Sequence, residues 1–341
     1  CTLTAGMYAN ASTLNSLFGR GARTVKPLEQ AEALDADYYT QAYSSKSESL
    51  AAAQELSAEI SDEGIVLLKN DGLLPLSDSA ALSPFGLRYC RPFYGGSGSS
   101  AIGDDGAHTI SPAQGLRTIF SSLNTALEEQ LFQAAGASEE IEENPSLTAA
   151  TPLQAPGKWT ILYEFSPDVY TDLADTCAGT VGVVFLGRQT GEDCDASVSV
   201  YDDGTPHMLA VTTAEQALIS FAKANCDGVV VVLASSSPME VSELENDPGV
   251  DAIVWLGGAG STGYGSLARV LSGQVNPSGR LPDLWAADFK RSPTFVNQDD
   301  GSDAFVYTNA DTTLVNRDSW EEHAGAPFRE YEEGIYLGYR Y

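Results

Sequence analysis

Length, composition and charge limit the classes of protein that this sequence can encode. The chain has 341 residues, 43% of them hydrophobic, so it is long enough for one large or two medium domains with a buried core. The formal net charge of −29, from 47 acidic and 18 basic residues, argues against nucleic acid and anionic membrane surfaces as partners, because like charges repel. Neutral ligands fit this charge better.

Residues 1–45 are polar and weakly periodic, which predicts an extension packed on a main domain over 46–341. The chain begins at Cys1 without an initiator methionine, so we expect an upstream segment. Residues 1–5 are compatible with the end of a removed hydrophobic segment, which favours an extracytoplasmic or surface-anchored location over a cytoplasmic one. No window approaches about 18 consecutive apolar residues, so the sequence predicts no membrane span of its own.

The first half of the main domain alternates helix and strand signals. Apolar residues at helical spacing predict a helix over 47–60, which Gly64 ends before a strand over 65–68. A second strand over 82–85 leads into a glycine-rich loop, and a helix over 126–135 closes at Gly136. The stretch 137–158 holds four glutamates and three prolines, and we expect a solvated surface loop without chemistry there.

The second half has the clearer pattern. We predict strands over 181–187, 229–233 and 252–256, and helices over 211–224 and near 241–244. Thr212 and Glu215 form the capping box of the first of these helices, and a further helix follows Gly257–Gly260 and ends at Gly273. Continuous apolar strands alternating with amphipathic helices predict an α/β fold, with a mostly parallel sheet sandwiched between helices.

A cluster of carboxylates follows the strand over 181–187. Glu192, Asp193 and Asp195 lie in the loop after a buried strand, where an open α/β fold places its chemistry. Mutual repulsion should raise at least one pKa, which suits a proton donor, and Glu192 is our candidate general acid. Two alternatives stay open at this point, a solvated acidic turn and a site for a hard cation, although the spacing matches no calcium loop.

The glycine-rich loop from Tyr94 to Ser100 resembles an anion cradle, but no lysine follows as a phosphate loop requires. An alternative explanation is that the glycines of this loop let the backbone approach a neutral ligand, for which Tyr94 provides a flat surface.

The three histidines have no nucleophile motif near them, so a hydrolase triad is unsupported. The five cysteines contain no Cys-x-x-Cys pair, which disfavours a zinc site, and their spacing requires no disulfide. Cys177 and Cys226 lie beside apolar runs, where a free thiol packs as a small hydrophobe.

Five blocks, taken together and in this order, resemble glycoside hydrolase family 3. They are Glu63–Asn70 with Leu74-Pro75-Leu76, Tyr94–Ser99, Gly187-Arg188 with Gly191-Glu192, Asn276–Pro282, and Tyr331–Tyr341. The resemblance covers residues 46–341 and corresponds to the family's α/β sandwich domain, a mostly parallel six-stranded sheet between helices. It implies a retaining exo-glycosidase, similar to β-glucosidases, that hydrolyses terminal β-linked sugars with two carboxylates and no cofactor or metal.

The resemblance also implies roles for individual residues. Glu192 corresponds to the acid/base glutamate, while the aspartate nucleophile belongs to a (β/α)₈ barrel whose motifs cannot be read in this chain. The partners implied are an oligosaccharide or β-glycoside substrate and that barrel, in cis or in trans. Residues implied at the cleft rim near the leaving group are Tyr94, Gly95, Gly96 and Ser97, and those implied to shape the acidic loop are Arg188 and Asp195.

The extension at the start of the chain suggests the permuted subgroup of the family, in which the sandwich precedes the barrel. Asp193 and Cys194 depart from the pattern expected in the acidic loop, and 88–92 is bulkier and more basic than usual, so the sugar and linkage stay open. One alternative function is a non-catalytic carbohydrate-binding or scaffold module with the same fold. A nucleotide-binding α/β domain is the other.

Overall fold

A computed structural model describes most of the chain between residues 41 and 292. The described residues are 10, 41–103, 108–154, 160–192, 196–292, 295, 306–307, 313–315, 322–324, 326–327, 333–336 and 340. The chain divides into two compact units, 1–50 and 51–341. Most of the predicted extension over 1–45 lies outside the described residues. Within the described part, no helix has the length and apolarity needed to cross a membrane.

The centre of the second unit is a six-stranded sheet. Its strands, in spatial order, are β1 (Val66–Asn70), β8 (Ala252–Trp255), β7 (Gly228–Leu233), β6 (Val181–Leu186), β2 (Ala81–Phe85) and β3 (Ser122–Leu123). All neighbours are parallel except β1, which pairs with β8 in the antiparallel sense. The predicted α/β fold with a mostly parallel sheet is therefore confirmed.

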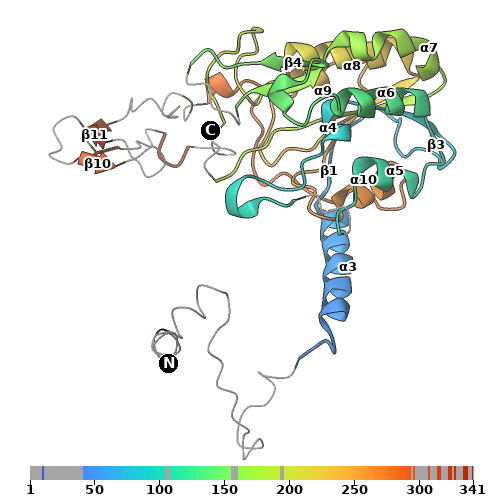
Figure 1. Cartoon of the computed structure of the whole chain (residues 1–341), viewed down its shortest axis with the longest axis horizontal. Coiled ribbons are helices and arrows are strands. Elements are labelled where there is room, and N and C mark those ends of the chain that lie inside the picture. The colour runs from blue at the N-terminus through green and yellow to red at the C-terminus, as the bar shows by residue number, and fades with distance from the viewer. Residues whose placement is uncertain are drawn as a thin grey trace, which may run out of the picture. The chain divides into compact units, whose positions relative to one another are not determined.

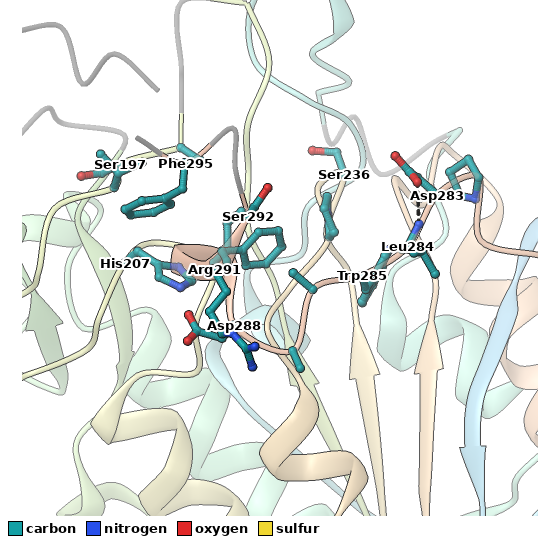
Figure 2. A pocket seen from close by; sticks show the side chains of 18 of the residues that line it. Ser197, His207, Ser236, Asp283, Leu284, Trp285, Asp288, Arg291, Ser292 and Phe295 are labelled. Carbon is teal, nitrogen blue, oxygen red and sulfur yellow. Dashed lines mark hydrogen bonds between the residues drawn. The ribbon is translucent and has the colours of Figure 1, made fainter. Parts of the chain in front are cut away.

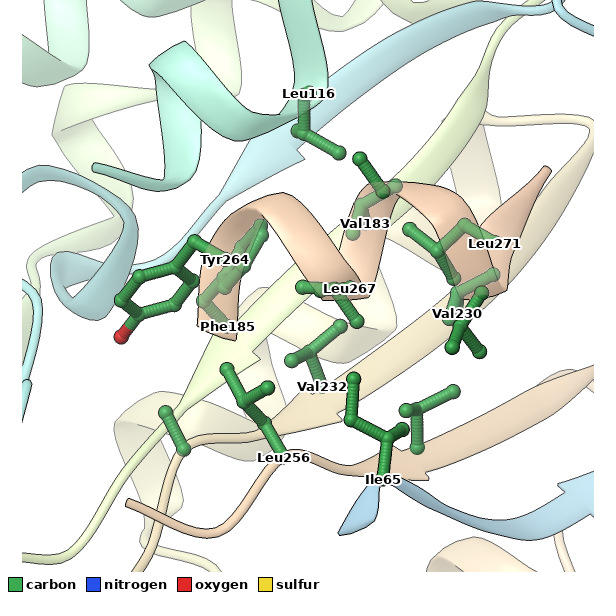
Figure 3. Packing of buried hydrophobic residues seen from close by; sticks show 14 of the residues in the cluster. Ile65, Leu116, Val183, Phe185, Val230, Val232, Leu256, Tyr264, Leu267 and Leu271 are labelled. Carbon is green, nitrogen blue, oxygen red and sulfur yellow. The ribbon is translucent and has the colours of Figure 1, made fainter. Parts of the chain in front are cut away.

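Both faces of the sheet are buried, which explains why the strands read as continuous apolar runs. On β6, Val183 and Phe185 pack on one face and Val184 and Leu186 on the other. The first face is covered by α5 (Pro112–Arg117) and α10 (Gly263–Leu271), whose packing Figure 3 shows. The second is covered by α6 (Thr125–Ala135), α7 (Ala174–Cys177), α8 (Thr213–Asn225) and α9 (Ser242–Glu245) (Figure 1).

The longer predicted helices are present, and their caps explain their limits. Thr212 accepts from the backbone N–H of Glu215 and the Glu215 side chain accepts in return, so the predicted capping box of α8 is confirmed. Helix α3 (Lys46–Gly64) also forms, but its predicted apolar positions Leu56 and Ile60 are exposed. The face of α3 that packs on α10 carries small and polar residues instead, such as Ser57, which hydrogen-bonds to Thr262 at 3.0 Å.

The prediction of a solvated surface loop over 137–158 is wrong for 147–150, which form a strand, while 155–158 lie outside the described residues. Strand β4 (Leu147–Ala150) pairs with β5 (Leu162–Phe165) in an antiparallel ladder, and Ala150 and Phe165 are buried. The remaining short elements are α4 (Leu87–Cys90), η3 (Gly98–Ser100), η4 (Ile141–Glu143), η5 (Pro167–Val169), η6 (Thr171–Leu173), η7 (Phe289–Arg291), β9 (Val306–Tyr307), β10 (Thr313–Val315), β11 (Glu322–Ala324) and β12 (Ala326–Pro327).

The order of the strands reverses between β2 and β6, which are adjacent and parallel. From β2 the chain continues to β3 at one side of the sheet, and from β6 it continues to β7 at the other side. The loops that leave the carboxyl ends of these two strands therefore diverge. Open α/β sheets bind their ligands at such a switch point, so the fold itself directs attention to the loops after β2 and β6.

Candidate active site

Two loops meet at the switch point. The glycine loop, defined here as residues 94–100, follows β2 and α4, and the acidic loop, residues 187–195, follows β6 directly. The structure describes the acidic loop as far as Glu192, so Asp193, Cys194 and Asp195 lie outside the described residues. Within the parts that are described, no group of three or more His, Cys, Asp or Glu side chains comes together as a metal site would need.

Glu192 is exposed, and the glycine loop holds its side chain. Its Oε2 accepts a hydrogen bond from the backbone N–H of Ser99 at 2.8 Å and another from the Ser99 hydroxyl at 2.6 Å. The Ser97 hydroxyl donates to the backbone carbonyl of Glu192 at 2.7 Å. The candidate acid and the glycine loop, more than 90 residues apart in sequence, are thus in direct contact.

The predicted rise in pKa is wrong for Glu192. The hydroxyl and backbone N–H of Ser99 hold the pKa of the Glu192 carboxyl below its usual range, because both hydrogen bonds favour the charged form. Exposure to solvent screens the repulsion from neighbouring acids and removes most of the desolvation that would raise the pKa. In this domain alone, Glu192 is a carboxylate at neutral pH.

Close contact between the loops explains two of the glycines. A Cβ on Gly98 would lie 2.5 Å from the Cβ of Glu192, and the φ of 62° at Gly98 also disfavours other residues. A Cβ on Gly191 would lie 2.7 Å from the backbone nitrogen of Ser97. Gly95, Gly96 and Ser97 are half-buried where the two loops touch. The glycines therefore serve the contact between the loops.

Tyr94 does not offer a face for a ligand, contrary to the sequence prediction. It is 4% exposed, and its ring packs edge-on against Tyr264 of α10 with the ring centroids 5.8 Å apart. Its backbone carbonyl accepts from the N–H of Gly260 at 2.7 Å. Tyr94 therefore fixes the base of the glycine loop on the core, below the surface at which a ligand would bind.

Arg188 is buried at the start of the acidic loop. Its guanidinium forms a two-pronged ion pair with Glu215, with nitrogen-to-oxygen distances of 2.6 and 2.7 Å. It also donates to the backbone carbonyls of Met208 and Ala210, each at 2.5 Å. The same Glu215 caps α8, so one carboxylate joins the acidic loop to the start of that helix.

A second buried carboxylate, Glu164 of β5, contacts the start of the segment that leads into the glycine loop. It is 3% exposed, and its Oε1 accepts from the backbone N–H groups of Leu87 and Phe165, each at 2.8 Å. Burial raises the pKa of Glu164 to about 7, against the effect of these hydrogen bonds and of the nearby Arg88. Because Leu87 begins α4, Glu164 anchors the segment that leads into the glycine loop.

A cavity of about 790 Å³ opens beside the acidic loop, near the ends of β7 and β8 (Figure 2). Ser236 lines it and hydrogen-bonds through its hydroxyl to Thr190 of the acidic loop at 3.2 Å. Its walls are mainly apolar and include Trp255 and Trp285, which pack edge-to-face with 5.2 Å between the ring centroids. His207 lines the same cavity and bonds to Glu240 at 2.9 Å.

Sequence reasoning missed several of these residues. Ser99 was named only as part of a glycine loop, although a hydroxyl inside such a loop is a ready hydrogen-bond donor. Glu164 was overlooked because the alternation in Leu162–Phe165 is only four residues long. Trp255 lies within the predicted strand over 252–256, and Trp285 follows the block Asn276–Pro282, so the sequence holds a usable signal for both.

The fold and the loops define a doubly wound α/β domain, and in its described part the carboxylate of Glu192 is anchored at the switch point. Residues 65–339 match the family model described as the glycosyl hydrolase family 3 C-terminal domain. The chain therefore belongs to glycosyl hydrolase family 3 and contains its C-terminal domain.

Known relatives agree with this assignment. The chain is 28% identical to beta-glucosidase A of Aspergillus kawachii over 290 residues, which are 84% of this chain and 29% of that protein. It is 26% identical to a beta-glucosidase of Ruminococcus albus, over 84% of this chain and 26% of the relative. The solved structure of beta-glucosidase 3B from Thermotoga neapolitana in complex with glucose superimposes with a TM-score of 0.65 at 25% identity, covering 86% of this chain and 36% of that one. The chain thus spans about a third or less of each relative.

Proposed function

We propose that this domain supplies the general acid/base residue of a retaining exo-β-glycosidase similar to β-glucosidases, and that Glu192 is that residue. The nucleophile is then an aspartate on a (β/α)₈ barrel in cis or in trans. The greater length of the relatives supports a missing second domain.

The observation that carries the proposal is the position of Glu192. It is exposed at the switch point of the sheet, and Ser97 and Ser99 fix its backbone and its side chain. A carboxylate that is held in place but accessible can reach a ligand bound by a second domain. A retaining mechanism needs the two carboxyl groups about 5–5.5 Å apart, so the barrel must dock against this edge.

The chemistry follows from that arrangement. In the first step, protonated Glu192 gives its proton to the glycosidic oxygen while the aspartate attacks the anomeric carbon and the leaving group departs. In the second step, the Glu192 carboxylate takes a proton from water, which attacks the same carbon and releases the sugar from the aspartate. Glu192 must therefore be protonated for the first step and ionised for the second.

Docking must therefore raise the pKa of Glu192. In the domain alone, Ser99 lowers this pKa. A barrel that excludes water from Glu192 and brings a second carboxylate within reach would raise it by desolvation and by repulsion between like charges. The acid role thus depends on the partner domain.

The neighbouring residues have supporting roles in this proposal. Gly95, Gly96 and Ser97 form the rim near the leaving group. Arg188 and Asp195 hold the acidic loop in shape. The apolar cavity beside Thr190 and Ser236 offers the flat rings of Trp255 and Trp285 to the leaving group, since apolar pockets with a few polar groups suit such ligands.

Substitution of Glu192 tests the assignment in the complete enzyme. Glu192→Gln should lower kcat/KM for natural β-glycosides by about 10²–10⁴-fold, the usual contribution of general acid catalysis. The loss should be much smaller for aryl glycosides with good leaving groups, and azide should restore turnover of these substrates. Glu129→Gln, which removes an exposed carboxylate on α6, is the matched control. Equal losses on both substrate types would contradict the acid role.

One feature favours a second candidate, a non-catalytic carbohydrate-binding or scaffold module. The lowered pKa of Glu192 is the state expected of a carboxylate that binds a ligand without donating a proton. The two candidates differ in the complete enzyme, where a module would leave activity unchanged in Glu192→Gln. Both predict that the 341-residue chain alone does not hydrolyse an aryl β-glucoside, and rapid hydrolysis by the purified chain would overturn the division of labour proposed here.

A further inference from the structure

The structure brings together two cysteines that are far apart in sequence. Cys177 is the last residue of α7, and Cys226 is the C-cap of α8, on the same face of the sheet (Figure 1). Cys177 is fully buried and Cys226 is half-buried. Both are free thiols, and their side chains lie close enough for each to shift the pKa of the other. Cys90, on α4, is the other free cysteine within the described residues.

A small polar network surrounds both sulfurs. The Thr180 hydroxyl lies 3.8 Å from the Cys226 Sγ and donates to the backbone carbonyl of Cys177 at 2.7 Å. Ser83 shares a hydrogen bond of 2.8 Å with Thr180 and accepts from the Asn124 amide at 3.0 Å. The two thiols therefore lie in one continuous set of hydrogen bonds.

The surroundings of Cys177 favour a thiolate. The Asn124 amide nitrogen lies 3.8 Å from the Cys177 Sγ, and the Thr176 hydroxyl lies 4.0 Å from it. The hydrogen bond from Cys226, helped by Ser83 and Thr176, lowers the pKa of the Cys177 thiol to about 6 against the opposing effect of burial. The same contact raises the pKa of the Cys226 thiol. The loss of the first proton therefore belongs to the pair of thiols, and the negative charge can move from the Cys177 sulfur to the more accessible Cys226 sulfur.

We propose that Cys177 and Cys226 form a dithiol site that small-molecule disulfides oxidise to an intramolecular disulfide. The half-buried Cys226 thiolate attacks one sulfur of the oxidant, forms a mixed disulfide and releases one thiolate. The Cys177 thiolate then attacks the Cys226 sulfur, closes the protein disulfide and releases the second thiolate. The two protons of the cysteines end on the two released thiols, so the oxidant is reduced by two electrons and the protein is oxidised by two.

The closed bond would constrain the part of the chain that carries the candidate active site. The segment between the two cysteines contains β6, the acidic loop and most of α8. Both cysteines, however, lie just before strands β6 and β7, at the amino ends of these strands, whereas Glu192 follows the carboxyl end of β6. Oxidation should therefore stabilise the domain without changing the contact between Glu192 and Ser99.

The test treats the full chain with oxidised glutathione and maps the products with trypsin. Cleavage after Arg188 and Lys223 separates Cys177 from Cys226, so a disulfide joins two peptides that are otherwise apart. We expect a mass loss of about 2 Da, that linked pair of peptides, and a rise in Tm of roughly 5–10 °C that dithiothreitol reverses. Cys90→Ser, the matched control, should behave like the wild type.

Cys177→Ser and Cys226→Ser should lose both the linked peptides and the rise in Tm. If either variant folds poorly by circular dichroism, binding of phenylarsine oxide to the wild-type chain gives a second measurement, because this reagent bridges two neighbouring thiols. One equivalent should bind the reduced protein and none the oxidised protein. Stable glutathione adducts without linkage, peptides linked only through other cysteines, or an unchanged Tm in the linked protein would each overturn the proposal.

Discussion

Substitution of the buried Glu164 should change how the stability of the domain depends on pH. Glu164→Gln keeps the side-chain shape and retains one oxygen that can accept from Leu87 and Phe165, the two backbone N–H groups that share Oε1 in the wild type. The variant removes the ability to ionise and replaces the second oxygen with an amide nitrogen, and only the first of these changes depends on pH near neutrality. Any difference in pH dependence between the two proteins therefore reports on this carboxyl group.

The size of the effect follows from the pKa of Glu164, which burial raises from 4.5 to about 7 in the folded state. Between these values the folded protein binds more protons than the unfolded protein, so stability falls as pH rises. The full shift corresponds to about 3 kcal/mol, of which about 2.5 kcal/mol is lost between about pH 5 and pH 8. The stabilising contribution of the protonated form is present at low pH and is lost as pH rises through 7.

The assay is urea denaturation of both proteins at several pH values, with the free energy of unfolding of the variant subtracted from that of the wild type. That difference should fall by about 2.5 kcal/mol between about pH 5 and pH 8. Glu129→Gln, with its exposed site on α6, controls for the loss of one negative charge. A difference that stays constant, or that rises with pH, would refute the argument, because it would mean that Glu164 is not held in its neutral form.

Three further outcomes are expected. Ser99→Ala should raise the pKa of Glu192 toward the usual value of a glutamate, because the hydroxyl donor is lost while the backbone donor remains. Carbon NMR of the carboxyl groups measures this pKa, and an unchanged value would contradict the hydrogen-bond explanation. Arg188→Met should lower the free energy of unfolding by about 3–5 kcal/mol, since Glu215 is left buried without its partner, and a loss below about 1 kcal/mol in urea would show that the ion pair matters little. Tyr94→Ala should cost about 3–5 kcal/mol by leaving a cavity against Tyr264, whereas unchanged thermal stability with weaker substrate binding would return Tyr94 to the cleft rim.

The parts of the fold that could be predicted from sequence are those with long local patterns. Continuous apolar runs specify strands β6 and β7, and the pair Thr212 and Glu215 specifies the start of helix α8. In each case the residues that carry the signal lie within a few positions of one another in the sequence. The ladder of β4 with β5 was missed because each strand has four residues and the intervening segment is rich in glutamate and proline. Short strands gain most of their stability from tertiary packing, which local sequence does not reveal.

The candidate site shows the same limit. The sequence predicts Glu192 in the loop after a buried strand, and in the structure Glu192 lies in the loop that follows β6. Its pKa could not be predicted from the neighbouring acids, because Ser99, 93 residues earlier, supplies the dominant hydrogen bonds. The burial of Tyr94 depends in the same way on Tyr264 of α10, whose ring packs against it although it comes 170 residues later in the sequence.

The antiparallel pairing of β1 with β8 has a consequence for synthesis on the ribosome. Val66 pairs with Trp255, so the first strand of the sheet has no partner until nearly 190 further residues have been made. At about 5–20 residues per second, this delay lasts on the order of 10–40 seconds. During that time β1 presents an unpaired strand edge to other nascent chains, which favours aggregation. Slow emergence of β8, or a break in the chain before Trp255, would leave β1 in that exposed state.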